Sequence, residues 1–223
     1  VRRLILTASG GPFREWSADR LERVTPAEAL AHPTWRMGGK VTVDSATLMN
    51  KALEVIEARW LYDFNDDQVD VVVHPQSIVH SMVEFADGSL KAQLGLPDMR
   101  IPIQYALTYP QHLPSPAPRL AGSDIPTLSF EPVDTARFPA LDIGRAAGKQ
   151  GPRASAALIA ADDIAVDRFL AGTLPFTGIA ALCADAVTRF GDGAAPDLPE
   201  LLALDTEVRA WAATATYAGA SRP

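Results

Sequence analysis

The chain has 223 residues, of which 48% are hydrophobic and 21% are charged, the balance of a globular protein with room for one or two domains. Its formal net charge is −7 and it has no basic stripe with interleaved aromatic residues, so nucleic acids and anionic membranes are poor partners. No apolar run approaches the ~18 residues of a membrane span. The lone Cys183 excludes an intrachain disulfide and indicates a reducing compartment.

The first predicted element is a strand over residues 3–7 (RLILT), which leads directly into Ala8-Ser9-Gly10-Gly11-Pro12. A strand that ends in Ser-Gly-Gly allows backbone N–H groups and a hydroxyl to approach a ligand, because glycine has no Cβ to clash. A simple turn is the alternative. No G-x-G-x-x-G or P-loop motif occurs in the sequence, so a dinucleotide fingerprint is absent from it.

Two helix starts follow in a polar segment. Ser17 is an expected N-cap, and so is Thr25, which is followed by Pro26 at the first helical position and Glu28 at the third. The second helix must end before Pro33, because proline cannot continue it.

Residues 32–39 then form a loop that carries His32, Trp35 and Met37 and ends in Gly38 and Gly39. A plain connecting loop would expose this apolar area to water without benefit. A lid, whose aromatic ring covers a ligand while the glycines allow closure, explains the composition better in chemical terms. The residues alone leave both interpretations open.

The stretch after this loop is the most regular in the chain. We expect a short extended piece over residues 40–43, then a helix capped by Ser45 and continuing to Trp60. Apolar side chains collect on one arc of this helix, namely Leu48, Met49, Ala52, Leu53, Val55, Ile56 and Trp60.

Polar side chains collect on the opposite arc, namely Thr47, Asn50, Lys51 and Glu54. One interpretation is a solvated face with an i, i+3 salt bridge between Lys51 and Glu54. The other is an anion site, because hydroxyls and free N–H groups at a helix start, with an amide and an ammonium one turn on, suit a phosphate. Glu54 would then be placed to bind a divalent metal ion.

Three strands are predicted next. Residues 69–73 (VDVVV) read as a buried strand, and residues 78–85 and 89–96 as a hairpin around Asp87-Gly88. His74 and His80 lie six residues apart across a proline turn, which is not a recognised ligand spacing. We therefore expect hydrogen-bonded sheet histidines rather than metal ligands.

The second half of the chain is different in composition. Nine prolines fall between residues 97 and 139, where a helix over 101–107 is followed after Tyr109 by an extended strap. Helices are then predicted over 140–147, 155–170, 177–190 and 198–217, with Cys183 as a small core residue. The predicted fold class is α+β: a domain with a mixed or antiparallel sheet flanked by helices (1–108), an extended linker (109–134) and a helical bundle (135–223).

Three long motifs also resemble one enzyme family. GGKVTVDSATLMNKALEVIEARWLY, with ASGGPF upstream and HPQSIVHSMVEFADGS downstream, is similar to 1-deoxy-D-xylulose 5-phosphate reductoisomerase, over nearly the whole chain. The resemblance implies conversion of this phosphorylated ketose to 2-C-methyl-D-erythritol 4-phosphate with NADPH and a divalent metal ion (Mg²⁺, Mn²⁺ or Co²⁺), in isoprenoid biosynthesis. It also implies a homodimer in a bacterial cytoplasm or a plastid stroma.

The same resemblance implies roles for individual residues. Side chains at five positions would hold the phosphate and nearby oxygens, namely Ser9, His32, Ser45, Asn50 and Lys51. Glu54 would contact substrate and ligate the metal, Gly38 would contact NADPH, and Trp35 and Met37 would shield the site as parts of the lid.

The family pattern also includes an N-terminal nucleotide-binding domain and a carboxylate–Ser–carboxylate segment, and this sequence contains neither. We therefore expect the C-terminal two-thirds of such an enzyme, a fragment or truncated product that is inactive by itself. Two alternatives remain: a catalytically inactive remnant that binds a phosphosugar or dimerises, and a subunit of a different metal-dependent sugar-phosphate isomerase.

Overall fold

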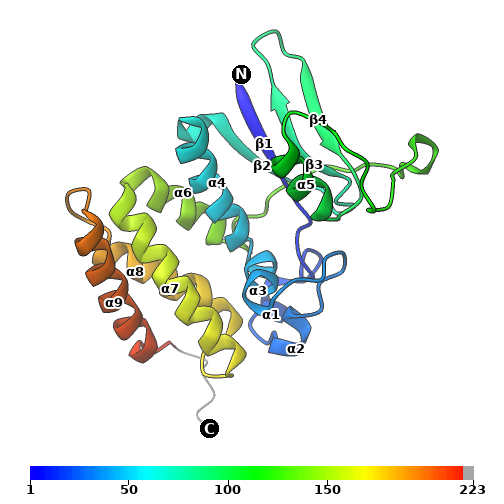
Figure 1. Cartoon of the computed structure of the whole chain (residues 1–223). Coiled ribbons are helices and arrows are strands. Elements are labelled where there is room, and N and C mark those ends of the chain that lie inside the picture. Colours follow the sequence, from blue (N-terminus) through cyan, green and yellow to red (C-terminus); the bar gives the residue numbers. More distant parts are fainter. Residues whose placement is uncertain (218–223) are drawn as a thin grey trace.

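The computed structural model describes residues 1–217, and within them a mixed β-sheet lies beside a bundle of helices (Figure 1). The described strands follow the order β4-β3-β1-β2-β5 across the sheet. Their bounds are β1 (Arg3–Ala8), β2 (Val69–Val73), β3 (Val79–Glu84), β4 (Leu90–Leu94) and β5 (Glu131–Pro132). β1 and β2 are parallel and the other neighbours are antiparallel, which confirms the predicted α+β class.

The helices of the first half lie between β1 and β2, and after β4. Their bounds are α1 (Ala18–Leu21), α2 (Pro26–Ala29), α3 (Gly39–Thr47), α4 (Met49–Tyr62) and α5 (Arg100–Thr108), with short 3-10 turns η1 (Asp66–Gln68) and η2 (Gly122–Asp124). The Thr25 side chain accepts from the Glu28 backbone N–H and the Glu28 carboxylate accepts from the Thr25 backbone, as predicted for a capping box. Ser17 occupies the N-cap position of α1 without a capping hydrogen bond.

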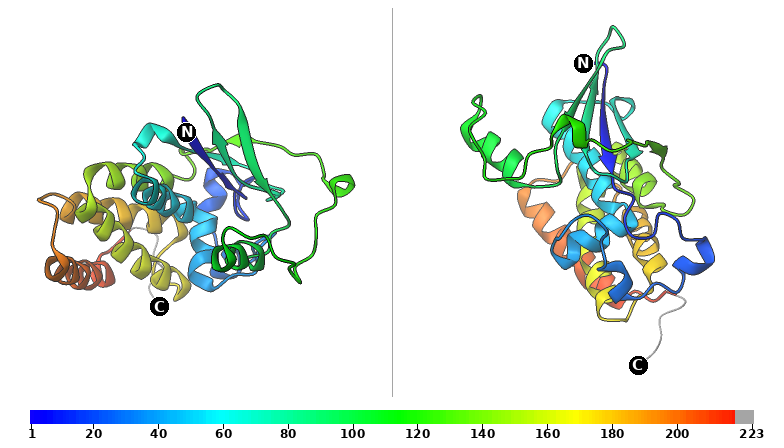
Figure 2. Two further views of the ribbon diagram at one scale, coloured as in Figure 1. Left: turned by 45° about the horizontal axis from the view of Figure 1, so that its top comes forward. Right: turned by 90° about the vertical axis from the view of Figure 1, so that its right-hand side faces the viewer.

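The second half forms the predicted bundle of α6 (Ala140–Gln150), α7 (Pro152–Leu170), α8 (Phe176–Phe190) and α9 (Leu198–Thr214). Figure 2 shows these helices grouped on one side of the molecule, with α4 between them and the sheet. The close approach of α6 to α4 depends on Gly144, because a Cβ there would lie 2.4 Å from the Ala52 Cβ. Cys183 is fully buried in α8, as expected of a core residue.

The predicted start of the central helix is wrong. Residues 40–43 are helical rather than extended, because α3 spans Gly39–Thr47, and Ser45 is buried near its end instead of capping a helix. The β-branched residues there favour a strand by propensity alone, but burial of Val43 and Ala46 in the core stabilises the helix. Leu48, in the left-handed conformation at φ 64°, separates α3 from α4.

Two other expectations are corrected in detail. Trp60 does not belong to the buried face of α4, since its side chain is 69% exposed. The strap after α5 is extended as predicted, but it also joins the sheet through β5, and the Phe130 ring stacks on the His74 ring at 4.7 Å. We propose the division 1–108, 109–134 and 135–223, with the middle segment as a strap that crosses the edge of the sheet.

Candidate phosphate-binding site

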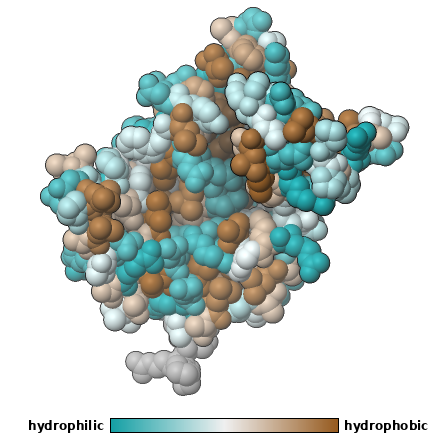
Figure 3. Space-filling view, viewed as in Figure 1, coloured by the Kyte–Doolittle hydropathy of each residue, from teal (hydrophilic) through white to brown (hydrophobic). Residues whose placement is uncertain are grey.

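A cavity of about 420 Å³ lies where the end of β1, the loop before α3, the first turns of α4 and the turn before β3 meet. Its walls include residues that the sequence predicted as site residues, namely Ser9, Trp35, Met37, Ser45, Asn50, Lys51 and Glu54. Figure 3 shows a hollow on this face of the molecule, with a largely hydrophilic floor and hydrophobic residues at its rim. The structure therefore brings seven of the nine predicted site residues together, whereas His32 and Gly38 are not among the residues that line the cavity.

Two glycines bring Ser9 and Ser45 to the same wall. Gly10 and Gly11 both have positive φ, at 84° and 66°, and turn the chain sharply after β1. A Cβ on Gly11 would lie 2.8 Å from the Ser45 carbonyl oxygen and 2.9 Å from the Ala46 Cα. Only glycine permits this contact without moving backbone. The Ser-Gly-Gly turn is therefore a packing element of the cavity wall.

His32 connects the two serines. Its Nε2 lies 3.1 Å from the Ser9 Oγ and 3.1 Å from the Ser45 Oγ. Its Nδ1 accepts from the backbone N–H groups of Thr34 and Trp35, at 3.1 and 2.9 Å. Nδ1 must therefore be unprotonated, so Nε2 carries the hydrogen of the neutral ring.

This tautomer has a chemical consequence. The Nε2–H group donates to a serine oxygen, which leaves the serine hydroxyl hydrogens free to donate to an anion. Burial lowers the pKa of His32, which keeps the imidazole neutral at physiological pH. The neutral His32 ring therefore holds the Ser9 and Ser45 hydroxyls in place through hydrogen bonding.

Asn50, Lys51 and Glu54 lie on one side of α4, facing the cavity. The Lys51 Nζ contacts both Glu54 carboxylate oxygens, at 2.7 and 2.6 Å, and the Asn50 Nδ2 lies 3.5 Å from one of them. The predicted salt bridge thus exists, and it exists inside the cavity rather than on open surface. An anionic ligand would compete with Glu54 for Lys51, whose side chain is 13% exposed.

The loop before α3 forms the outer wall. Trp35 and Met37 line the cavity, and the Trp35 ring lies 6.3 Å from the His80 ring on β3. Gly38 is the N-cap residue of α3, and a Cβ there would meet nothing within 4 Å. Gly38 is not among the residues that line this cavity, so its predicted NADPH contact would involve a ligand outside it.

The lining also includes residues that were not predicted as site residues, among them Arg36, Ser77, His80 and Met99. Ser77 has a φ of 51°, and no sequence signal distinguished it from other turn residues. His80 lies in β3, as expected of a sheet histidine, and its ring also lines the cavity, 6.3 Å from the Trp35 ring. His74 meets that expectation, because its ring nitrogens contact the Ser129 carbonyl oxygen at 2.9 Å and the Ile78 N–H at 3.2 Å.

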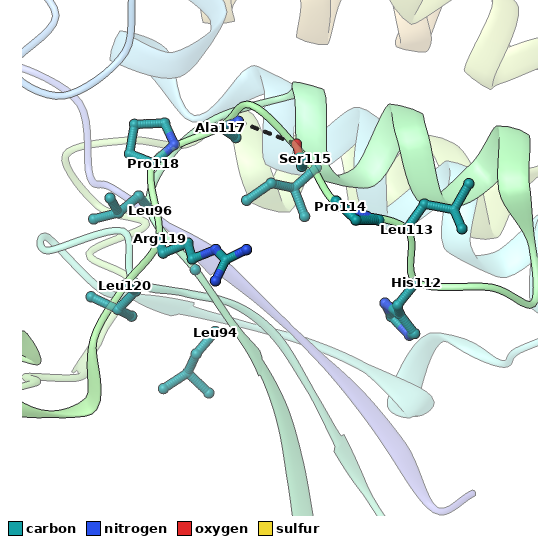
Figure 4. A pocket seen from close by; sticks show the side chains of 12 residues that line it. Leu94, Leu96, His112, Leu113, Pro114, Ser115, Ala117, Pro118, Arg119 and Leu120 are labelled. Atoms are coloured by element: carbon teal, nitrogen blue, oxygen red, sulfur yellow. Dashed lines mark hydrogen bonds between the residues drawn. The ribbon is translucent and has the colours of Figure 1, made fainter.

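A second hollow, of about 550 Å³, lies between β4 and the strap after α5. Figure 4 shows its walls, where leucine and proline side chains predominate and the Ser115 hydroxyl is engaged by the Ala117 N–H at 3.2 Å. Arg119 and His112 are its charged or titratable side chains. Within the described part of the chain, the hollow has no set of converging polar side chains like Ser9, Ser45, Asn50 and Lys51, so the candidate site is the first cavity.

The cavity is incomplete as a metal site within residues 1–217. No group of three or more His, Cys, Asp and Glu side chains in that part of the chain is arranged to hold a metal ion. Glu54 is the one carboxylate among the cavity-lining residues, whereas Mg²⁺ prefers several oxygen ligands. In the same part of the chain, no helix has the length and apolarity needed to cross a membrane.

The fold and the cavity define an α+β domain with a pocket of small-metabolite size, in which a few polar side chains converge from a largely apolar wall. Residues 94–211 match the family described as DXP reductoisomerase C-terminal domain, and residues 1–62 match the family described as 1-deoxy-D-xylulose 5-phosphate reductoisomerase C-terminal domain. The chain belongs to the 1-deoxy-D-xylulose 5-phosphate reductoisomerase family.

Individual relatives agree with this. The chain is 55% identical to the reductoisomerase of Rhodopirellula baltica over 210 residues, covering 94% of this chain and 46% of the relative. It is 53% identical to that of Pelotomaculum thermopropionicum over 209 residues, covering 94% and 54%. The chain spans about half the length of the curated relatives it matches.

Solved structures show the same fold. A reductoisomerase in complex with NADPH, fosmidomycin and magnesium superposes with a TM-score of 0.89 at 40% identity, covering 95% of this chain and 54% of that one. The Zymomonas mobilis enzyme in complex with NADPH superposes with a TM-score of 0.88 at 41% identity, covering 96% and 55%.

Proposed function

We propose that this chain is the substrate-binding portion of a reductoisomerase that converts 1-deoxy-D-xylulose 5-phosphate to 2-C-methyl-D-erythritol 4-phosphate with NADPH. The observation that carries the proposal is the single cavity shared by Ser9, Ser45, Asn50 and Lys51. Two hydroxyls, an amide and an ammonium are donors suited to a phosphate. Phosphate binding far from the reacting carbons would hold them aligned for chemistry.

Each polar side chain has a part in this arrangement. Lys51 would transfer its contact from Glu54 to the ligand, which would free the carboxylate. His32 would hold the two serine hydroxyls in place from behind, through its Nε2–H. Trp35 and Met37 would cover the ligand and exclude water when the loop closes.

The cofactor and the metal ion would act where this chain meets the rest of the enzyme. Glu54, once released from Lys51, would supply one oxygen ligand to Mg²⁺, and Mn²⁺ and Co²⁺ are the alternatives. The described residues provide a single cavity carboxylate, which by itself does not complete a Mg²⁺ site. Gly38 would contact NADPH at the outer side of the lid. When bound, NADPH supplies the hydride.

The free edge of the sheet supports a homodimer. Every residue of β4 is exposed, and apolar side chains of the neighbouring helix and strap are exposed as well: Ile103 by 53%, Leu107 by 82% and Tyr109 by 74%. An exposed edge strand beside an apolar surface is rare in monomers. A second copy of this chain would cover it, and sedimentation velocity would detect the dimer. The bacterial origin of the relatives favours a bacterial cytoplasm over a plastid stroma.

Isothermal titration of the chain with 1-deoxy-D-xylulose 5-phosphate tests the proposal. We expect binding to the wild type, strong loss with unphosphorylated 1-deoxy-D-xylulose, and strong loss in Lys51→Ala. Lys149→Ala, which removes an exposed lysine of α6, is the matched control and should bind as the wild type does. Equal affinity for the phosphorylated and unphosphorylated sugars, or no binding of either, would contradict the assignment of the cavity.

A further inference from the structure

A buried cluster of charged groups joins α3 to the helical bundle. The Lys40 Nζ donates to the Asp44 Oδ2 at 2.7 Å and also to the Asp162 Oδ2 of α7. The Asp162 side chain is fully buried and the Asp44 side chain is 5% exposed. None of these residues lines the cavity of about 420 Å³ that contains Ser9, Ser45 and Lys51. The role proposed above for the cavity therefore does not explain the cluster.

The charges of the cluster do not balance if both carboxyl groups are ionised. Two buried carboxylates then face one ammonium, and the Asp44 Oδ1 is buried without a hydrogen-bond partner. Burial, followed by the negative charge of Asp162, raises the pKa of Asp44 to about 7. A neutral Asp44 can donate its hydrogen to Asp162, which satisfies the group and removes the excess charge.

The cluster lies between two parts of the candidate site. Asp44 immediately precedes Ser45, whose hydroxyl contacts His32 and whose carbonyl is packed against Gly11. Lys40 follows Gly38, the residue at which the lid loop ends and α3 begins, by two positions. One face of α3 is therefore fixed to α7 while the other presents Ser45 to the cavity.

The same network continues into the bundle. Asp163 lies 3.5 Å from the Lys40 Nζ and pairs with Arg209 of α9 at 2.7 Å. The groups nearest Asp44 are Lys40 of α3 and Asp162 of α7. One contact further away lie three more titratable or charged groups: Asp163 of α7, Cys183 of α8 and Arg209 of α9. Burial raises the pKa of the Cys183 thiol, so it stays neutral near pH 7.

We propose that Lys40, Asp44 and Asp162 form a clamp that fixes α3, and with it Ser45 and the end of the lid loop, in the arrangement that binds a phosphorylated ligand. These are positioning residues, since none of them lines the cavity. The ligand part of this inference rests on the proposed function, whereas the fixation of α3 by the bundle does not.

The clamp would respond to pH. Above about pH 7, loss of the Asp44 proton leaves an uncompensated negative charge between α3 and α7, which weakens the contact. Asp44→Asn keeps the neutral form at every pH with nearly the same shape. We therefore expect the ligand affinity of the wild type to fall with rising pH relative to that of Asp44→Asn.

Hydrogen–deuterium exchange on the whole chain tests the fixation of α3 without any ligand. Lys40→Met should raise amide exchange about tenfold over residues 31–47 and leave residues 79–94 of the β3–β4 hairpin, which do not contact the cluster, unchanged. Asp44→Asn should exchange like the wild type at pH 6 and more slowly at pH 8.5. Unchanged exchange over residues 39–47 in Lys40→Met would overturn the clamp. If Lys40→Met does not fold, the exchange of Asp44→Asn is compared with that of the wild type at pH 8.5. Equal exchange over residues 39–47 at that pH would overturn the clamp.

Titration with 1-deoxy-D-xylulose 5-phosphate from pH 6 to pH 8.5 then tests the link to binding. The ratio of wild-type to Asp44→Asn dissociation constants should rise by roughly tenfold, which is the effect of a one-unit pKa difference between the free and bound states. The ratio cancels the titration of the phosphate and of His32, and Asp167→Asn, which changes an exposed carboxylate of α7 outside the cluster, is a control expected to follow the wild type. A ratio of dissociation constants that does not change between pH 6 and pH 8.5 would overturn the link between the clamp and ligand binding. Absence of binding at every pH would refute the proposed function, while the exchange data would still decide the clamp.

Discussion

Replacing Gly11 by alanine tests how the Ser-Gly-Gly turn builds the cavity. Gly11 has a φ of 66°, and an alanine in the left-handed region costs about 1–2 kcal/mol. The added Cβ would also lie 2.8 Å from the Ser45 carbonyl oxygen and 2.9 Å from the Ala46 Cα, both of which are backbone atoms. Because backbone must shift to relieve this overpacking, we add about 1–3 kcal/mol. The expected loss in the free energy of unfolding of Gly11→Ala is thus about 2–5 kcal/mol.

Gly88→Ala is the matched control. Gly88 also has a positive φ, at 84°, but a Cβ there would meet nothing within 4 Å. Gly88→Ala therefore has the conformational cost of a positive φ without a steric clash. The difference in the free energy of unfolding between the two variants isolates the contact of residue 11 with the Ser45 and Ala46 backbone. Urea denaturation followed by circular dichroism should show Gly11→Ala less stable than Gly88→Ala by about 1–3 kcal/mol. Equal stabilities would refute the reasoning.

The same pair of variants separates packing from binding. In Gly11→Ala the backbone of Ser45 must move, so affinity for a phosphosugar should fall even at temperatures where the variant is folded. Gly88→Ala, in the turn between β3 and β4, should bind as the wild type does. If Gly11→Ala is destabilised but binds normally, Ser45 does not contribute to the site.

Three further predictions concern the cavity. Lys51→Met should weaken phosphosugar binding about 10- to 150-fold in calorimetric titrations, the loss of about 1.5–3 kcal/mol typical of a charged hydrogen bond, whereas Lys149→Met should not. Burial lowers the pKa of His32 below its unfolded value of 6.5, so the unfolded state binds more protons and stability is lost as pH falls below about 6.5. The urea midpoints of His32→Asn and the wild type should therefore converge between about pH 7.5 and about pH 5.5, and parallel curves would contradict this. Finally, the 223-residue chain, given NADPH, Mg²⁺ and 1-deoxy-D-xylulose 5-phosphate, should not oxidise NADPH, because its sequence has no G-x-G-x-x-G motif and its cavity has one carboxylate; family-like turnover would refute this.

Periodicity predicted much of the candidate site. Asn50, Lys51 and Glu54 share a helix face whatever the rest of the fold does, because the 3.6-residue repeat places them there. The sequence did not decide whether that face meets water or a ligand. The structure shows that this face lines a cavity whose wall also includes Ser9 and Ser45.

The helix break at Leu48 was beyond sequence reasoning. No glycine or proline marks it, and the left-handed conformation of a leucine is unfavourable by itself. Packing of α3 and α4 on the core compensates locally, since Leu48 and Met49 are both buried. Ser45 consequently reaches the cavity from the end of one helix rather than as the cap of another.

The sequence by itself determined β1 to β4, the helical bundle, the proline-rich strap and the polar arc of α4, because each depends on neighbours within a few residues. Only the tertiary structure decided which distant groups meet. The His80 ring stands opposite Trp35, and Lys40 contacts Asp162 across 122 positions of sequence. Such contacts depend on how helices and strands pack around a shared core, and local sequence patterns contain no record of that packing.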